Sequence, residues 1–212
     1  MKTYPICLVG LEQRRAVLVG GGSVAARRAL ALLDAGVHLT TISPAFCDEF
    51  PDPAQYPALN LVARPFIPGD LQGAFLAIAA TNDMAVNHQV WSEAIQLGIL
   101  VNVVDDPAHS NFIVPAVVQR GEVKIAITTG GGSPALARRL RECLEKTIGP
   151  EYGDLATLLA ELRPEIIQRF PPGEPRLQVA LRLVDSDLLE ILRSSGLSAG
   201  RQRARALLEL DT

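Results

Sequence analysis

The sequence predicts an α/β protein built on a doubly wound parallel sheet, and three observations support this. Short apolar strands alternate with helical patterns as far as residue 106, which is typical of a parallel sheet with helices on both faces. A loop of three glycines, Gly20 to Gly22, joins the first strand to the first helix. After residue 111 the pattern changes to a hairpin and then to helices. We therefore expect a Rossmann-like sheet, a hairpin segment and a small helical C-terminal domain.

The first β-α-β unit occupies residues 15–42. An apolar strand at 15–19 runs into the glycines, a helical pattern follows from Ser23 to Ala35, and Gly36 ends it. The β-branched and apolar run at 37–42 predicts the second strand. Because a helix connects them, these strands should be parallel neighbours in the sheet.

The rest of the sheet follows the same logic. A short strand is expected at 60–64, and the apolar runs at 75–80 and 99–104 predict strands that are covered on both faces. Between the last two, Thr81-Asn82-Asp83 should cap a helix from about Met84 to Leu97.

The two ends of the chain depart from this pattern. The apolar segment at 4–9 is expected to pair antiparallel to the first strand. Residues 112–119 and 123–128 predict a hairpin that turns at Arg120-Gly121. Residues 151–212, rich in Leu, Ala, Arg and Glu, predict a small helical domain.

Composition excludes several classes of partner. The 212 residues, 48% of them apolar, are enough for one full core and a smaller appendage. A formal charge of -3 leaves no overall basic field for nucleic acid or an anionic membrane. No apolar run approaches the ~20 residues that span a bilayer, and three scattered cysteines fit no disulfide framework. We expect a cytoplasmic protein that binds neither nucleic acid nor membrane.

The first glycine loop has the pattern of a dinucleotide site. Gly20-x-Gly22-x-x-Ala25 stands between a strand and a helix, where a pyrophosphate binds. Gly20 allows the tight turn, Gly22 lets the backbone approach the phosphates, and Ala25 lets the helix pack on the strand. The helix N-terminus adds free N–H groups and a positive dipole. Nucleotide binding is therefore favoured over a purely structural turn.

The acidic residue that normally binds the ribose hydroxyls is missing. Ser43-Pro44 stands where that residue would end the second strand. Asp48 and Glu49 are candidates to replace it. No arginine lies close enough in sequence to bind a 2′-phosphate, since the next one is Arg64. NAD is therefore favoured over NADP.

A second glycine loop, Gly130 to Ser133, precedes a helix that should run to about Ile148. Ser133 is a good N-cap and Pro134 a good first helical residue. The bare glycine backbone and a nearby arginine suit an anion such as a phosphate or a carboxylate. A flexible connection before an ordinary capped helix is an equally good interpretation. The residues of the candidate anion site are Gly131, Gly132, Ser133 and Arg138.

Two polar segments fall at the carboxyl ends of strands, where α/β sheets bind ligands. Thr81 and Asn82 offer hydroxyl and amide groups that can orient a nicotinamide ring. Asn102 and Asp105 follow at the last strand, and Asp105 can take or give a proton, although Asp-Asp-Pro is also a common surface turn. His109 is a weak candidate for a metal ligand or proton carrier, and no zinc spacing is present.

Taken together, these motifs resemble the siroheme synthase N-terminal family, over residues 3–150. The family contains precorrin-2 dehydrogenases, some of which also insert iron into sirohydrochlorin. The tail at 151–212 is similar only in being helical. The matching segments are Val-Leu-Val-Gly-Gly-Gly-Ser-Val-Ala at 17–25, Ala-Thr-Asn-Asp at 80–83, Asn-Val-Val-Asp at 102–105, Phe-Ile-Val-Pro-Ala at 112–116, and Ile-Thr-Thr-Gly-Gly-Gly-Ser-Pro-Ala-Leu-Ala-Arg at 127–138.

The resemblance implies an NAD-dependent oxidation of precorrin-2, a tetrapyrrole, to sirohydrochlorin on the way to siroheme. It makes Asp105 the essential aspartate, serving both dehydrogenation and any insertion of Fe²⁺ (a lyase activity). It also implies a homodimer joined through the hairpin segment. The implied cofactor contacts are Ser23, Val24, Pro44 and Ala45, next to Ser43. The expected domains are an NAD-binding Rossmann domain at 1–110, a dimerisation hairpin and helix at 111–150, and a helical domain at 151–212.

The alternative is an NAD-sensing regulatory module without catalysis. Such modules normally carry the acidic ribose ligand that Ser43 replaces here. They would also have no evident use for the segment 102–105 followed by a second anion-ready loop. The dehydrogenase is therefore the favoured interpretation.

Overall fold

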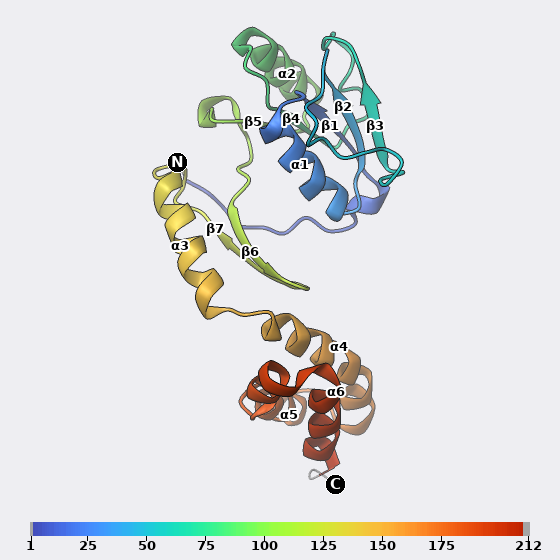
Figure 1. Ribbon diagram of the computed structural model, residues 1–212, viewed down its shortest axis with the longest axis vertical. Helices are drawn as coiled ribbons and strands as arrows, with labels where there is room; N and C mark the ends of the chain where they lie inside the picture. Colours follow the sequence, from blue (N-terminus) through green and yellow to red (C-terminus); the bar gives the residue numbers. More distant parts are fainter. Residues whose placement is uncertain (1, 210–212) are drawn as a thin grey trace. The chain divides into compact units, whose positions relative to one another are not determined.

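The structure is a computed structural model that describes residues 2–209. The chain divides into two compact units, Met1–Val114 and Pro115–Thr212. The first unit contains the predicted sheet, and the second contains the hairpin and the remaining helices (Figure 1). The predicted α/β, Rossmann-like fold class is confirmed, while the division into three domains stays a prediction.

The sheet of the first unit is parallel throughout, with the strand order β3-β2-β1-β4-β5. The central strand β1 pairs with β2 on one side and β4 on the other. The segment 4–9 therefore finds no free edge on β1, and the expected antiparallel pairing is wrong. Its residues lie in no strand, and Tyr4 and Val9 are exposed. The strands are β1 (Arg15–Val19), β2 (His38–Ile42), β3 (Leu59–Val62), β4 (Leu76–Ala79) and β5 (Leu100–Val103).

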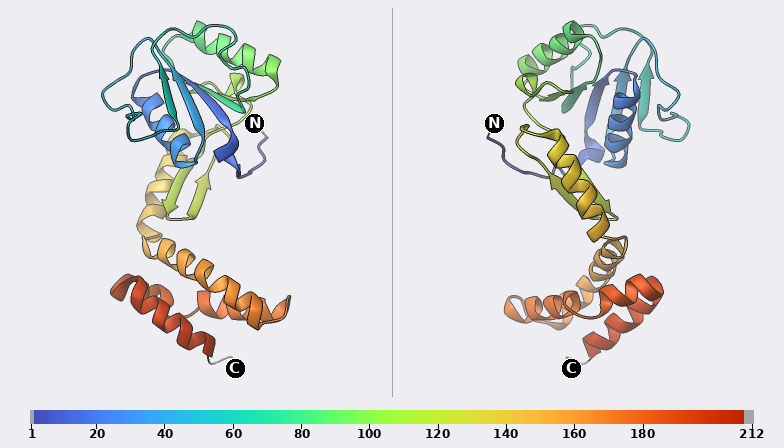
Figure 2. Two further views of the ribbon diagram at one scale, coloured as in Figure 1. Left: turned by 90° about the vertical axis from the view of Figure 1, so that its right-hand side faces the viewer. Right: turned by 60° about the vertical axis from the view of Figure 1, so that its left-hand side comes forward.

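Helices cover both faces of this sheet (Figure 2). Helix α1 (Ser23–Asp34) packs on β1 and β2 over a core that includes Leu18 and Ile78. Helix α2 (Met84–Leu97) packs on β4 and β5 over the opposite face, which includes Val17. Successive strand residues point to opposite faces, so the continuous apolar runs supply both cores.

The helix ends lie where the sequence predicts them. The carboxylate of Asp83 accepts the N–H groups of Ala85 and Val86 at 2.8 and 3.3 Å, which caps α2. Gly98 ends α2 in the left-handed conformation, with φ of 68°. Short loops and helix N-termini follow the carboxyl ends of the strands directly. Polar groups therefore lie at this edge of the sheet.

In the second unit, β6 (Ala116–Arg120) and β7 (Val123–Ile127) form the predicted antiparallel hairpin, and α3 (Pro134–Thr147) packs on it (Figure 2). The first strand begins later than residue 112, where the prediction placed it. Phe112 instead packs against the core beneath α1, and Pro115 has no N–H to donate to a ladder.

Three helices complete the second unit: α4 (Glu151–Arg169), α5 (Glu174–Val184) and α6 (Leu188–Glu209). Buried apolar side chains, most of them leucines, join these helices, among them Leu158, Leu183 and Leu188. The backbone of α6 has a kink at Gly196, where φ is 77° and ψ is -179°. No helix within residues 2–209 is long and apolar enough to cross a membrane.

An ion pair between the exposed Arg193 and the buried Glu151 ties α6 to the start of α4. The Nε atom of Arg193 donates to Oε1 of the buried Glu151 at 3.0 Å. This hydrogen bond, supported by a backbone hydrogen bond, holds the pKa of Glu151 below its usual value. Since the folded-state pKa is the lower one, the pair stabilises the fold above the unfolded-state pKa of about 4.3. That stabilisation is lost as the pH falls through the folded-state pKa.

We expect Glu151→Gln to lower the melting temperature at pH 7 and to remove part of its fall in acid. Glu161→Gln is the matched control, because Glu161 pairs with Arg201 at the exposed surface and such pairs contribute little. Thermal unfolding of the three proteins between pH 3 and 7 checks this. Equal melting temperatures for wild type and Glu151→Gln at pH 7 would contradict it.

Candidate active site

Two backbone crossings hold the first glycine loop. Gly20 has φ of 134°, and a Cβ atom there would lie 2.4 Å from the carbonyl oxygen of Ala80. A Cβ at Gly21 would lie 1.9 Å from the carbonyl oxygen of Ala45. Hydrogen bonds hold both crossings, since Ala80 N–H donates to the Val19 carbonyl and Cys47 N–H donates to the Gly21 carbonyl, both at 2.8 Å. A side chain at position 20 or 21 would therefore displace the neighbouring backbone.

Gly22 is different, because nothing lies within 4 Å of the place where its Cβ would be. Gly22 is also the N-cap of α1, and no side chain caps this helix. By contrast, Asp83 caps α2 and Ser133 caps α3. The free N–H groups and positive dipole of α1 thus face open space, which is the arrangement that binds a pyrophosphate.

This open space is part of a cavity of about 630 Å³ at the carboxyl edge of the sheet. Ser23 and Val24 follow directly as the first residues of α1. Most of the predicted cofactor residues therefore meet at one cavity, whose size is typical of ligand sites, while Ser23 and Val24 begin α1 without lining it. The predicted residues that line the cavity are Gly20, Gly22, Ser43, Pro44, Ala45, Thr81 and Asn82.

Sequence reasoning missed several of the cavity walls. Phe46, Cys47 and Phe66 line it from the segments after β2 and β3. These segments have no regular periodicity, so no sequence pattern places their side chains. Gly21 also lines the cavity. Sequence reasoning gave it no role, because the dinucleotide-binding motif assigns roles only to the glycines on either side of it.

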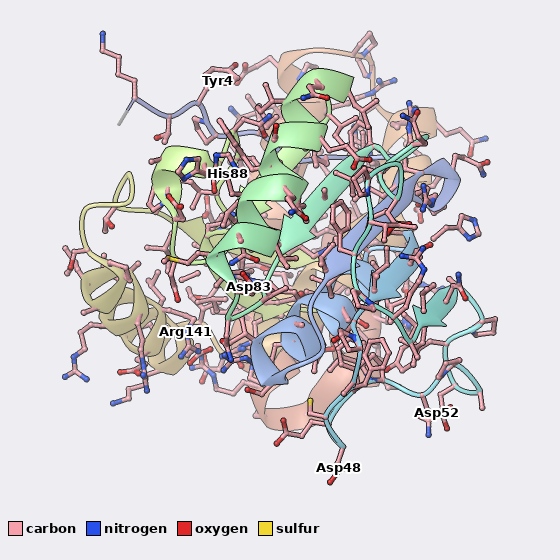
Figure 3. The ribbon with its side chains drawn as sticks, turned by 90° about the horizontal axis from the view of Figure 1, so that it is seen from above. Tyr4, Asp48, Asp52, Asp83, His88 and Arg141 are labelled. Carbon is pink, nitrogen blue, oxygen red and sulfur yellow. The ribbon has the colours of Figure 1, made fainter. Side chains whose placement is uncertain are left out.

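Ser43 serves the loop that follows β2. Its hydroxyl donates to the carbonyl oxygen of Ala45 at 2.7 Å and so turns the chain at the point where Ala45 meets Gly21. Asp48 and Glu49, the candidates for the missing ribose acid, are exposed and do not line the cavity. Figure 3 shows Asp48 projecting outward from its loop.

Thr81 is held in place by Asn87 of α2, a residue that the sequence analysis missed. The Thr81 hydroxyl donates to Asn87 Oδ1 at 2.7 Å, and Asn87 Nδ2 donates back to the Thr81 carbonyl at 3.0 Å. Asp83, one turn earlier on the same helix, caps α2 (Figure 3). Asn82, between Thr81 and Asp83 in the sequence, is exposed. The polar rim of the cavity is therefore ordered by the start of α2.

Asp105 follows β5 in an unusual backbone conformation. Its φ is 61°, and it is the one non-glycine residue with a positive φ among residues 2–209. The side chain is exposed. Such conformations cost free energy and concentrate at functional sites. Asn102, by contrast, is buried, and its Nδ2 atom donates to the carbonyl oxygen of Phe112 at 3.1 Å.

His109 pairs with Asp106 rather than with Asp105. Its Nδ1 atom lies 2.6 Å from Asp106 Oδ2, and this hydrogen bond holds the pKa of Asp106 below its usual value. The ring also stacks edge-on against Trp91, at 4.7 Å, and lies near His88 of α2 (Figure 3). Within residues 2–209, no group of three or more His, Cys, Asp or Glu side chains could hold a metal ion.

The second glycine loop lies in the second unit and closes on itself. Thr129 Oγ1 accepts from Ser133 N–H at 3.0 Å and donates to the Ser133 carbonyl at 3.1 Å. The Ser133 hydroxyl caps Leu136 N–H at 3.2 Å, and Arg138 pairs with Glu142 at 2.9 Å. These contacts describe a well-capped helix, and the anion site at Gly131, Gly132, Ser133 and Arg138 stays a prediction.

Comparison with known proteins bears on this geometry. The family described as "Putative NAD(P)-binding" matches residues 7–116, the part that contains the sheet and its cavity. The chain belongs to this family. A second family, described as "Sirohaem biosynthesis protein central", matches residues 120–147. The resemblance to the siroheme synthase N-terminal family and the expectation of a nicotinamide cofactor are therefore confirmed.

Relatives with curated names point the same way. The siroheme synthase of Nitrosomonas eutropha is 44% identical over 177 residues, or 83% of this chain and 37% of that protein. Siroheme synthase 1 of Aeromonas salmonicida is 39% identical over 203 residues, or 95% of this chain and 43% of that protein. The chain thus spans about two fifths of these relatives. The solved structure of "SirC, precorrin-2 dehydrogenase" has a TM-score of 0.77 and 27% identity, covering 96% of this chain and all of that one.

We expect Gly22→Ala and Gly21→Ala to fail in different ways. Gly22→Ala should fold with a melting temperature close to wild type, because its Cβ meets no protein atom. The methyl group would occupy the phosphate position, so the Kd for NAD should rise about tenfold or more. Gly21→Ala should instead unfold at lower temperature, because its Cβ overlaps Ala45.

Calorimetric titration with NAD and thermal unfolding of both variants check this pair of outcomes. Unchanged NAD affinity in a folded Gly22→Ala protein would place the cofactor elsewhere.

Proposed function

We propose that the protein is an NAD-dependent precorrin-2 dehydrogenase that forms sirohydrochlorin in siroheme biosynthesis. One observation carries the proposal: the cofactor cavity and Asp105, held at a positive φ, belong to the same carboxyl edge of one parallel sheet. The ligand crevice of such sheets lies at that edge. The structural likeness to a precorrin-2 dehydrogenase and the match to siroheme synthases support the choice of substrate.

The contacts of Arg64 support NAD rather than NADP. Its two terminal nitrogens, NH1 and NH2, donate to Asp70 Oδ2 and Oδ1 at 2.7 and 2.6 Å. A two-pronged pair of this kind occupies the guanidinium. Arg64, the next arginine in the sequence after β2, is therefore committed to Asp70 and is not free to bind a 2′-phosphate.

The chemistry requires the removal of one hydride and one proton from the reduced macrocycle. Bound NAD supplies the acceptor for the hydride. The loop Gly20–Gly22 and the first N–H groups of α1 would bind its pyrophosphate, and Thr81, held by Asn87, would orient the nicotinamide end. The carboxylate of Asp105 would receive the proton, because it is exposed to an incoming substrate. Two electrons and two protons thereby leave the substrate.

The proposal extends to iron insertion, with Fe²⁺ and sirohydrochlorin as substrates. Insertion removes two pyrrole protons, and Asp105 is the exposed carboxylate that would accept them one at a time. His109 is a poorer candidate, because its Nδ1 atom is engaged by Asp106. The glycine loop of the second unit, with Arg138, is proposed separately as a site for carboxylates. The expected location remains the cytoplasm.

We expect Asp105→Asn to retain NAD binding and to lose precorrin-2 oxidation by a factor of about 10² or more. Asparagine tolerates the left-handed conformation as aspartate does, so the variant isolates the charge. Asp105→Gly is the second variant, because it relieves the backbone strain and should raise the melting temperature while remaining inactive. The absorbance of sirohydrochlorin formed from precorrin-2 and NAD gives the rate.

Full activity of Asp105→Asn would remove Asp105 from the mechanism. Absence of turnover in the wild type, with NAD still bound, would favour the NAD-sensing module instead. The same variants, supplied with Fe²⁺ and sirohydrochlorin, test insertion separately.

The second unit supports the proposal of a homodimer. Its sheet has two strands, β6 and β7, so each has an unpaired edge within the described residues. Isolated hairpins are marginally stable, and Val117, Leu136 and Leu140 are exposed on this hairpin and on α3. A partner that adds strands and covers these side chains would complete the layer.

We expect light scattering to give about twice the chain mass for wild type and a shift toward monomer for Leu140→Glu. Leu177→Glu is the control, because Leu177 is similarly exposed on α5, away from the hairpin in sequence. A wild-type monomer at micromolar concentration would contradict the proposal.

A further inference from the structure

Arg28 of α1 stands out among the arginines of the chain. It is half-buried, yet it makes no hydrogen bond or ion pair with any of residues 2–209. Other half-buried arginines have polar partners: Arg15 donates to the carbonyls of Gln72 and Asp70, and Arg120 to those of Ile148 and Glu145. A guanidinium with five donors and no acceptor is costly to bury.

The electrostatic surroundings of Arg28 confirm that it lacks a partner. Burial lowers the pKa of its guanidinium, the adjacent charge of Arg27 lowers it further, and the charge of Asp105 raises it. Asp105 thus supplies an opposite charge that acts on Arg28, and no hydrogen bond joins the two side chains. The two residues form an open pair of opposite charges.

The fold explains why they come together. Asn102 of β5 is in register with Ile78 of β4, which is in register with Leu18 of β1, on the face that α1 covers. Helix α1 packs on β1 and β2 on this face, while α2 packs on β4 and β5 over the opposite face. Helical side chains lean toward the helix N-terminus, so Arg28 leans toward the edge where Asp105 lies.

Phe112, in the segment after β5, is a partly buried apolar side chain on the same face of the sheet. It packs against the core beneath α1. A ligand that suits the region has a flat apolar body and at least one carboxylate. Precorrin-2 and sirohydrochlorin have this chemistry, with eight carboxylates around a macrocycle. The surface between α1 and β5 thus combines a cation, a proton acceptor and an apolar contact.

We propose that Arg28 binds one carboxylate of the tetrapyrrole and so holds the macrocycle against Asp105. The inference rests on the proposed dehydrogenase function and adds a substrate-binding residue to it. Arg28 acts on binding: its unused donors take a carboxylate in a two-pronged contact. Without a bound carboxylate, the guanidinium of Arg28 is unpaired at some cost in stability, which is a known feature of binding sites.

The test compares Arg28→Met and Arg28→Lys with the control Arg27→Met, which removes an exposed arginine one residue away. For Arg28→Met we expect the KM for precorrin-2 to rise about tenfold or more. Arg28→Lys should recover part of this loss. The Kd for NAD should stay within about twofold of wild type, since the pyrophosphate binds at Gly22. The melting temperature of the ligand-free protein should be equal or higher.

A second readout needs no turnover. Fluorescence titration with uroporphyrin III, which carries eight carboxylates, should give weaker binding to Arg28→Met and wild-type binding to Arg27→Met. Its octamethyl ester, which lacks the charges, should bind wild type and Arg28→Met equally. Equal affinities of both proteins for uroporphyrin III would overturn the inference.

Four further outcomes would overturn it. One is a lower melting temperature in Arg28→Met with unchanged KM, which would make Arg28 structural. Another is a higher Kd for NAD with unchanged KM, which would assign Arg28 to the cofactor. If wild type oxidises precorrin-2 and Arg28→Met does so equally well, the proposed function stands without this inference. If wild type does not oxidise precorrin-2, the proposed function fails and the inference fails with it.

Discussion

The cofactor edge of this protein depends on two backbone crossings that leave no room for a side chain. Gly20 passes the carbonyl of Ala80, and Gly21 passes that of Ala45. These crossings bring the ends of β1, β2 and β4 together and set where α1 begins. The bare N-terminus of α1, the cavity and the turn at Ser43 all follow from them. A loop built this way is rigid before any ligand arrives, which lowers the entropy cost of binding.

Charge is distributed unevenly over this edge. Acids and bases that support the fold are paired, as Arg64 is with Asp70 and His109 is with Asp106. Asp105 and Arg28 are without such pairing, and Asp105 also adopts a backbone conformation that costs about 1–2 kcal/mol. Charged residues that lack a hydrogen-bonded partner at one edge of a well-packed sheet are candidates to bind a substrate, because the substrate can supply the missing partner.

Local sequence signals predicted the helices well because specific residues begin and end each of them. Gly36 and Gly98 end their helices, and Asp83 and Ser133 begin theirs. The pairing of strands was harder to predict from the sequence. The segment 4–9 has the composition of a strand, but the neighbours of β1 had already taken both its edges. The sequence could not show this, because strand order is a property of the whole sheet.

The sequence predicted the glycines of the site and the polar residues at the strand ends. It did not predict the hydrogen bonds that hold these residues in place. The motif placed Gly20, Gly22, Thr81 and Asp105 at one edge. It did not show that Asn87 holds Thr81 or that Arg64 is committed to Asp70, because these contacts depend on how α2 and irregular segments pack. For Arg28, the sequence shows a charge on a helix, and the missing partner is visible once the neighbours are known.

A crystal structure with NAD and sirohydrochlorin bound together tests the central claim most directly. The account predicts the pyrophosphate against Gly22 and the first N–H groups of α1. The macrocycle should lie between the nicotinamide ring, at hydride-transfer distance, and the carboxylate of Asp105, at proton-transfer distance. A macrocycle bound where Asp105 cannot reach it, or a dinucleotide bound away from the glycine loop, would contradict the account.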